Sequence, residues 1–229
     1  MMQRRIKKGR IHAMNTRNDS CVERKLYSKA FYGDAHENRL RAAAKIVPLL
    51  VALIRPKSVL DVGCGTGLWL AAAKQCGVNE IMGIDGDWVE KGSLDISSEC
   101  FLACDLKSGF DLGRHFDLAW SFEVAEHLPP DAADLFVKSL VKHADVIAFS
   151  AAVPNQGGVL HVNEQWQDYW VERFRRAGYI ASDYVRKQIW HDENIESYYC
   201  QNIILFAART AVANINALQQ RCDWREMVC

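Results

Sequence analysis

The sequence predicts an α/β protein with a doubly wound, mostly parallel seven-stranded sheet, a C-terminal antiparallel hairpin and helices on both faces. Between residues 57 and 150, short apolar runs alternate with helical stretches at the spacing of stacked βαβ units. These runs lack the polar alternation of half-exposed strands, as expected of strands covered on both faces. Two longer runs follow, and no repeat or proline-rich linker divides the chain.

The first expected element, at residues 34–54, is one or two helices, because Pro48 must either kink a helix or begin a new one. Helices at Leu68–Cys76 and Asp131–His143 fill gaps between strands, and Asp131 places negative charge in a first turn, where the helix dipole favours it. The expected parallel strands are Ser58–Val62, Glu80–Ile84, Cys100–Cys104, Phe116–Ser121 and Val146–Ser150.

After Ser150 the pattern changes. A Gly-Gly loop leads into a helix expected around Asn163–Ala177 and ended by Gly178. The runs near Tyr179–Trp190 and Tyr198–Arg209 then predict the closing antiparallel hairpin.

These elements divide the chain into four expected parts. Residues 1–22 form a basic tail that we expect to be disordered, and residues 23–56 a helical segment that caps the site. Residues 57–209 form the main domain, and residues 210–229 a helical tail.

The charge of the 229-residue chain is balanced, with 28 basic and 28 acidic residues. Six of the basic residues and no acidic residue lie within residues 1–18, so the remainder carries a net charge of −6. We therefore expect nucleic acid to be an improbable partner. The basic segment could also be an electrostatic arm or an organelle-targeting segment.

Membrane insertion is not expected, because the apolar run from Ile46 to Ile54 is only nine residues long and contains Pro48. The eight cysteines include no Cys-x-x-Cys pair, which favours reduced thiols and implies no zinc site. We expect a soluble, cytoplasmic protein, whereas the sequence leaves the oligomeric state open.

The most informative stretch is residues 59–68, Val-Leu-Asp-Val-Gly-Cys-Gly-Thr-Gly-Leu, a strand that runs into alternate glycines and then a helix. Glycines there let backbone N–H groups approach a ligand at a helix N-terminus. A dinucleotide fingerprint would need glycine at Leu68, which weakens a nicotinamide interpretation. Asp85 ends the second strand, where an acid commonly accepts hydrogen bonds from ribose hydroxyls, and Asp105 closes the third strand.

In these residues the chain resembles the class I S-adenosylmethionine-dependent methyltransferases, over about Ser58 to Arg209. Four signals fall in the family's order: the glycine motif, an acidic strand end, an adenine-contacting turn, and a fourth strand with its following loop. They are Val59–Gly67, Met82–Asp85, Ala103–Leu106 and Phe116–Leu128.

The resemblance implies S-adenosylmethionine as cofactor. Gly63 and Gly65 would frame its methionine end, with Asp61 near the amino group. Asp85 would bind the ribose and Asp105 the adenine amino group. The full implied set of cofactor-binding residues is Asp61, Gly63, Cys64, Gly65, Gly67, Asp85, Gly86, Trp88, Asp105, Leu106, Ser121 and Glu123. Gly67 could instead only permit helix packing, Asp61 and Asp105 could only cap strand ends, and Trp88 could be surface cover.

Glu123, Glu126 and His127 form an E-x-x-E-H array, which with His161 resembles the metal-binding pattern of some methyltransferases. Carboxylate oxygens and imidazoles could hold a divalent ion. The same letters also fit a packed loop, and we expect no obligatory metal.

The loop from Pro154 to Trp166 follows the fifth strand, at the edge where open α/β sheets place ligands, and its polar side chains suit a polar substrate. His161 is the first candidate for a catalytic base and His127 the second, since imidazole titrates in the useful range. We expect methyl transfer to a small polar molecule, plausibly at a hydroxyl oxygen. The alternatives are an RNA or protein methyltransferase, a nucleotide-binding oxidoreductase, and a non-catalytic cofactor-binding scaffold.

Overall fold

The computed structural model describes residues 36–214 and 216–225. The basic tail expected at residues 1–22 lies outside this part of the chain. Among the described residues, no helix combines the length and apolar character needed to cross a membrane.

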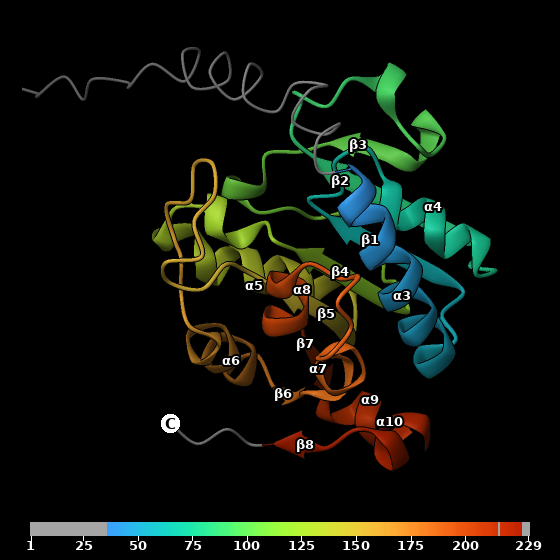
Figure 1. The fold of residues 1–229 in the computed structure, drawn as a ribbon, viewed down its shortest axis with the longest axis vertical. Helices are drawn as coiled ribbons and strands as arrows, with labels where there is room; N and C mark the ends of the chain where they lie inside the picture. The colour runs from blue at the N-terminus through green and yellow to red at the C-terminus, as the bar shows by residue number, and fades with distance from the viewer. Residues whose placement is uncertain (1–35, 215, 226–229) are drawn as a thin grey trace, which may run out of the picture.

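One mixed sheet forms the centre of the molecule, with the strand order β3-β2-β1-β4-β5-β7-β6-β8 (Figure 1). The strands from β3 to β5 are parallel, whereas β7 runs antiparallel to both of its neighbours, β5 and β6. This arrangement confirms the predicted fold class, and β8 adds a short eighth strand at the edge. The strands are β1 (Ser58–Val62), β2 (Glu80–Asp85), β3 (Phe101–Ala103), β4 (Leu118–Phe122), β5 (Val146–Ser150), β6 (Tyr179–Ser182), β7 (Ile204–Ala208) and β8 (Trp224–Arg225).

Helices cover both faces of the sheet because alternate strand residues point to opposite sides. Val59 of β1 joins the core cluster under α3 and α4, whereas its neighbour Leu60 joins the cluster under α5 and α6. The helices are α3 (His36–Ile54), α4 (Leu68–Gln75), α5 (Ala133–His143), α6 (Gln167–Arg176), α7 (Tyr184–Ile189), α8 (Ser197–Asn202), α9 (Arg209–Asn214) and α10 (Asn216–Arg221).

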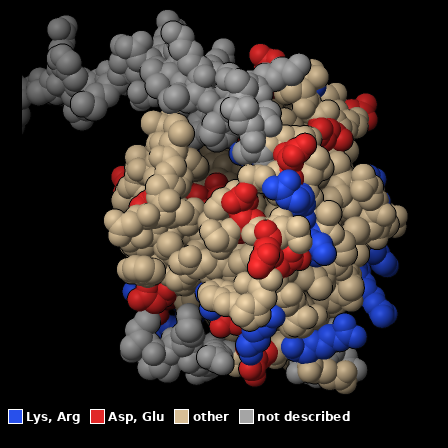
Figure 2. All heavy atoms as spheres, in the orientation of Figure 1, with Lys and Arg blue, Asp and Glu red and all other residues tan. Residues whose placement is uncertain are grey.

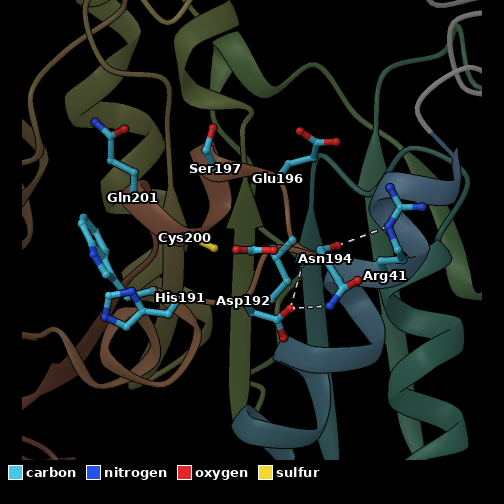
Figure 3. Close-up of a pocket in the computed structure, with 11 residues that line it drawn as sticks. Arg41, His191, Asp192, Asn194, Glu196, Ser197, Cys200 and Gln201 are labelled. Carbon is cyan, nitrogen blue, oxygen red and sulfur yellow. Dashed lines mark hydrogen bonds between the residues drawn. The ribbon is translucent and has the colours of Figure 1, made fainter.

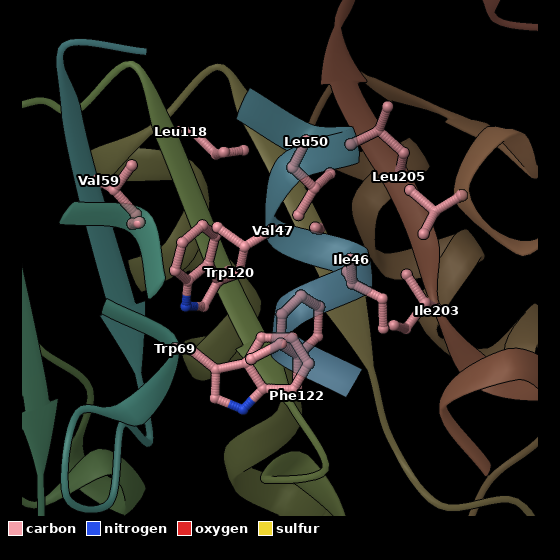
Figure 4. Packing of buried hydrophobic residues seen from close by; sticks show 14 of the residues in the cluster. Ile46, Val47, Leu50, Val59, Trp69, Leu118, Trp120, Phe122, Ile203 and Leu205 are labelled. Carbon is pink, nitrogen blue, oxygen red and sulfur yellow. The ribbon is translucent and has the colours of Figure 1, made fainter. Parts of the chain in front are cut away.

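Helix α3 packs its apolar side chains across the middle of the sheet (Figure 4). Ile46, Val47 and Leu50 recur at helical spacing and are fully buried. Beneath them, Trp120 stacks on Phe122 with 6.1 Å between ring centroids. This packing fixes the start of α3 beside the carboxyl ends of the central strands.

Of the two alternatives left open at Pro48, the structure has a single helix, because α3 continues through the proline. Two sequence predictions need correction. The expected helix around Asn163–Ala177 begins only at Gln167. The two runs of the expected hairpin form the shorter strands β6 and β7, and α7 and α8 lie between them.

Candidate active site

A cavity of about 820 Å³ opens at the carboxyl ends of the parallel strands. Its wall is built mainly from the loops that follow β1 to β5, because parallel strands end at the same edge of a sheet. His36 and Arg39 of α3 and Tyr198 and Tyr199 of α8 complete the wall. Predicted site residues that line it are Gly63, Cys64, Gly65, Asp85, Trp88, Asp105, Leu106, Glu123, Glu126, His127 and His161.

The glycine loop after β1 adopts a backbone that other residues rarely reach. Gly63, Gly65 and Gly67 have φ angles of 81°, 54° and 85°. A Cβ on Gly63 would lie 2.3 Å from a methyl group of Val124, so the loop after β4 packs directly on this backbone. Gly67 lies outside the cavity wall and packs under Ile96, the packing role left open by the sequence.

Asp85 connects the end of β2 to the glycine loop. Its carboxylate accepts hydrogen bonds from the backbone N–H groups of Gly65 at 2.7 Å and Gly86 at 2.6 Å. Burial raises the pKa of Asp85, and these two bonds oppose the shift. The ring of Trp88 lies over Gly86, because a Cβ there would come within 2.2 Å of it. Gly86 itself lies behind the wall.

Asp61 lies beneath the glycine loop, behind the cavity wall. It is 3% exposed, and its Oδ2 has no hydrogen-bond partner among the described residues. Burial raises the pKa of Asp61 to about 8, and the nearby carboxylate of Asp85 raises it further. The indole N–H of Trp120 opposes this rise, although it makes no hydrogen bond of ordinary geometry. The site therefore holds a buried carboxyl group that a cation would satisfy.

The remaining predicted cofactor residues divide between wall and interior. Asp105 reaches the cavity, but its carboxylate also caps the turn after β3, accepting from the Lys107 N–H at 3.0 Å and the Ser108 hydroxyl at 2.8 Å. Cys64 is buried, which raises the pKa of its thiol. Ser121 is fully buried and does not line the cavity.

Glu123 is held by amide side chains from the loop after β5 and from the end of α8. Its carboxylate accepts from Gln156 Nε2 at 2.7 Å and from Asn202 Nδ2 at 3.2 Å. Asn202 Nδ2 also lies 2.8 Å from Gln156 Oε1. Glu123 has a φ of 55°, a strained value for this residue type, so the network fixes a costly conformation in the loop after β4.

The two candidate bases lie face to edge, with 4.9 Å between their ring centroids. The Glu126 carbonyl brings them together, because it accepts the N–H groups of Val162 at 2.8 Å and Asn163 at 3.0 Å. Nδ1 of His161 lies 2.9 Å from Oε1 of Glu164. Burial lowers the pKa of His127 to about 4, and His161 adds to the shift.

Comparison with known proteins identifies the family. A family model described as a methyltransferase domain matches residues 35–194. The chain belongs to this methyltransferase family. That assignment confirms the class I resemblance and its cofactor, S-adenosylmethionine. A search of curated proteins finds no match for this methyltransferase.

Solved structures with the same fold are distant in sequence. The methyltransferase shares 15% identity with DesVI of Streptomyces venezuelae, with a TM-score of 0.58 over 77% of this chain and 96% of that one. The plantazolicin methyltransferase BpumL, in complex with S-adenosylhomocysteine, shares 15% identity, with a TM-score of 0.57 over 82% of this chain and 91% of that one. A putative O-methyltransferase from Nostoc punctiforme shares 15% identity, with a TM-score of 0.56 over 77% of this chain and 59% of that one. At such identities the comparison establishes the fold.

The methyltransferase has a second cavity, of about 710 Å³, between α3 and the loop that joins α7 to α8 (Figure 3). Arg41 reaches across from α3, and its Nε donates to the carbonyl of Asn194 at 3.2 Å. Asp192, Glu193 and Glu196 make the rim acidic. Figure 2 shows acidic and basic side chains close together on the face that α3 occupies. None of the glycine-loop residues lines this second cavity.

Sequence reasoning missed several wall residues. Arg39 and His36 precede the first strand by about twenty residues, and no motif marks them. Asn202 lies just before the apolar residues of β7, and nothing in that sequence predicts its contact with Glu123. Of these wall residues, only Tyr198 and Tyr199 carried a sequence signal: two adjacent aromatic residues in a polar stretch could have been predicted to line a binding site.

Proposed function

We propose that the protein transfers the methyl group of S-adenosylmethionine to a hydroxyl oxygen of a small polar molecule. The observation that carries this proposal is that one cavity joins a cofactor-type wall to a pair of histidines. The glycine loop and Asp85 line one part of its wall, and His127 and His161 another.

The residues of the first part fit the cofactor. Gly63 and Gly65 line the cavity with backbone that carries no side chain, and Asp85 presents a carboxylate to hydroxyl groups. The unpartnered Oδ2 of Asp61 suits a cationic amino group nearby. Trp88, Leu106 and Cys64 supply apolar surface for the remainder.

When bound, S-adenosylmethionine supplies an electrophilic methyl group, whose carbon bonds to the acceptor oxygen as the carbon–sulfur bond breaks and its electron pair remains on sulfur. The chain's own residues have to align the acceptor, exclude water and remove the hydroxyl proton. We assign proton removal to the histidine pair, with His161 first because the carboxylate of Glu164, 2.9 Å from its Nδ1, fixes the orientation of the ring.

Calorimetry with S-adenosylhomocysteine and with NAD⁺ tests the cofactor half of the proposal. We expect binding of S-adenosylhomocysteine and not of NAD⁺, because the glycine spacing departs from the dinucleotide fingerprint. A preference for NAD⁺ would overturn the proposal.

The acceptor half is tested on His161→Ala, once a screen of hydroxyl compounds has found a substrate by release of S-adenosylhomocysteine. We expect turnover to fall by roughly 10²–10⁴ with cofactor affinity nearly unchanged, because the proton is transferred only in the transition state. Melting temperature is measured on the same preparation. Wild-type turnover in this variant would remove His161 from the mechanism.

A further inference from the structure

Three metal-ligating side chains meet in the acceptor part of the cavity. One ligand atom each of Glu126, His127 and His161 lies within 4.8 Å of the others. Glu126 and His127 follow β4, and His161 belongs to the loop after β5. The hydrogen bonds from Val162 and Asn163 to the Glu126 carbonyl hold these two loops together, so the grouping is built into the fold.

The carboxylate of Glu126 is the observation that points to a ligand. The residue is 0% exposed, and neither carboxylate oxygen has a hydrogen-bond partner of ordinary geometry among the described residues. The neighbouring carboxylates of Glu123 and Glu164 repel it. The backbone N–H groups of Glu126 and Ala152 offset the burial of this carboxylate only in part, and a cation placed between its oxygens and the imidazoles would satisfy it.

Both imidazoles are oriented as metal ligands usually are. A ligating histidine generally gives its second ring nitrogen to a carboxylate or a backbone carbonyl, which fixes the tautomer and the ring. His161 places Nδ1 2.9 Å from Oε1 of Glu164, and its Nε2 lies beside the backbone of Gly158. The ring of His127 hydrogen-bonds the backbone of Leu160.

Glu123 does not belong to this group of ligand atoms. Its two carboxylate oxygens instead accept amide hydrogen bonds from Gln156 and from Asn202. The geometry therefore selects one carboxylate and two imidazoles, which differs from the E-x-x-E-H reading of the sequence.

We propose that Glu126, His127 and His161 bind one divalent transition-metal cation, such as Mn²⁺, beside the acceptor. Two imidazoles and a carboxylate suit first-row transition metals better than Mg²⁺ or Ca²⁺, which prefer oxygen ligands. This departs from the expectation that no metal is obligatory.

The inference deepens the proposed function and rests on it for the acceptor. Because the three side chains line the cavity, a cation that they hold would lie next to the space open to an acceptor oxygen. A cation there would orient that oxygen and lower the pKa of its hydroxyl group, so that the proton leaves to solvent water. With the cation bound, His161 is a ligand, and this replaces the direct proton transfer to the histidine pair in the proposed function.

The test measures Mn²⁺ binding to the chelator-treated full chain by calorimetry and by electron paramagnetic resonance. We expect one Mn²⁺ per chain. Glu126→Gln and His161→Ala should abolish this binding at millimolar Mn²⁺, whereas Glu164→Gln should weaken it by about 10–100-fold, as expected for an outer partner of a ligand. Glu193→Gln, in the acidic rim of the second cavity, should leave stoichiometry and affinity unchanged.

Binding of S-adenosylhomocysteine by each variant confirms folding and separates the two proposals. Absence of Mn²⁺ binding in a wild-type chain that binds S-adenosylhomocysteine would overturn the metal site and leave the proposed function standing. Loss of Mn²⁺ on Glu193→Gln, with retention on Glu126→Gln, would show adventitious binding to the acidic rim and would also overturn it. Mn²⁺ binding without S-adenosylhomocysteine binding would instead contradict the proposed function.

Discussion

At the scale of single residues, the carboxylates of the site differ in what they already bind. Asp105 uses its oxygens to cap a turn, and each oxygen of Glu123 accepts an amide hydrogen bond. Asp85 lines the cavity while accepting two backbone N–H groups, and Asp61 has an oxygen with no hydrogen-bond partner among the described residues. Asp85 and Asp61 are the carboxylates on which we test cofactor binding.

Asp85→Ala should weaken binding of S-adenosylhomocysteine by about tenfold or more, because hydrogen bonds to a charged group contribute about 1.5–3 kcal/mol. Calorimetry on the variant measures this loss. Glu90→Ala, an exposed acid in the same loop region, serves as the control and should bind like wild type. Unchanged affinity in Asp85→Ala would mean that the ribose-binding acid lies elsewhere.

We expect Asp61 to make cofactor affinity depend on pH. Its pKa of about 8 keeps it mostly protonated at pH 6, and a bound amino cation would favour the ionised form. Binding then releases a proton below pH 8, so affinity for S-adenosylhomocysteine should rise from pH 6 to 8, by at most about tenfold per pH unit. Calorimetry in two buffers of different ionisation enthalpy counts the proton.

Asp61→Asn should remove that proton release and flatten the pH dependence. The free protein should show the opposite trend in stability. Since the carboxyl ionises near pH 4 in the unfolded chain and near pH 8 in the folded one, the native state binds more protons between these values, and stability falls as pH rises through this window. Equal proton release by wild type and Asp61→Asn would contradict the assignment.

At the scale of elements, the central strands were predictable because they are buried on both faces. β1 and β5 have the predicted bounds, and all five residues of each are buried. The expected strand at Phe116–Ser121 begins at Leu118, although Phe116 still forms a bridge to Ala144.

Local patterns failed where distant contacts decide the backbone. The N–H groups of Asn163 and Gln165 donate to the carbonyls of Glu126 and Ala152, which hold this segment against neighbouring loops, and the extended backbone of Trp166 leaves Gln167 as the first helical residue. The wall residues from α3 and α8 were hidden for the same reason, because only the tertiary fold brings them to the strand ends. The glycine loop and Asp85, in contrast, belong to one contiguous βαβ unit and could be read in order.

Helix α3 provides a prediction at this scale. Pro48 lies inside the continuous helix on its exposed side, where it removes a backbone hydrogen bond and costs up to about 3 kcal/mol. Pro48→Ala should therefore raise the free energy of unfolding, measured by urea denaturation. Leu50→Ala, two residues further on and fully buried, should lower it by about 2–5 kcal/mol. A loss of stability in Pro48→Ala would show that the helix depends on the proline.

At the scale of the whole molecule, the fold is held by two core clusters on opposite faces of one sheet. Helix α3 contributes Ala42, Ala43, Ile46, Val47, Leu50 and Leu53 to the first of them. The family match begins at residue 35, next to the start of this helix. The chain from α3 onwards thus contains both the cofactor wall and the layers that support it.

Deleting residues 1–18 should therefore leave the melting temperature and the affinity for S-adenosylhomocysteine unchanged. The segment has no apolar periodicity able to bury a face, and its six like charges repel one another. Leu50→Ala in the same assay shows the fall in melting temperature expected when α3 loses a core contact. A comparable fall on deletion would mean that the segment packs on the domain. If turnover alone were lost while the cofactor still bound, the basic segment would contact the acceptor, and an acceptor carrying negative charge would then be favoured because six cations face it.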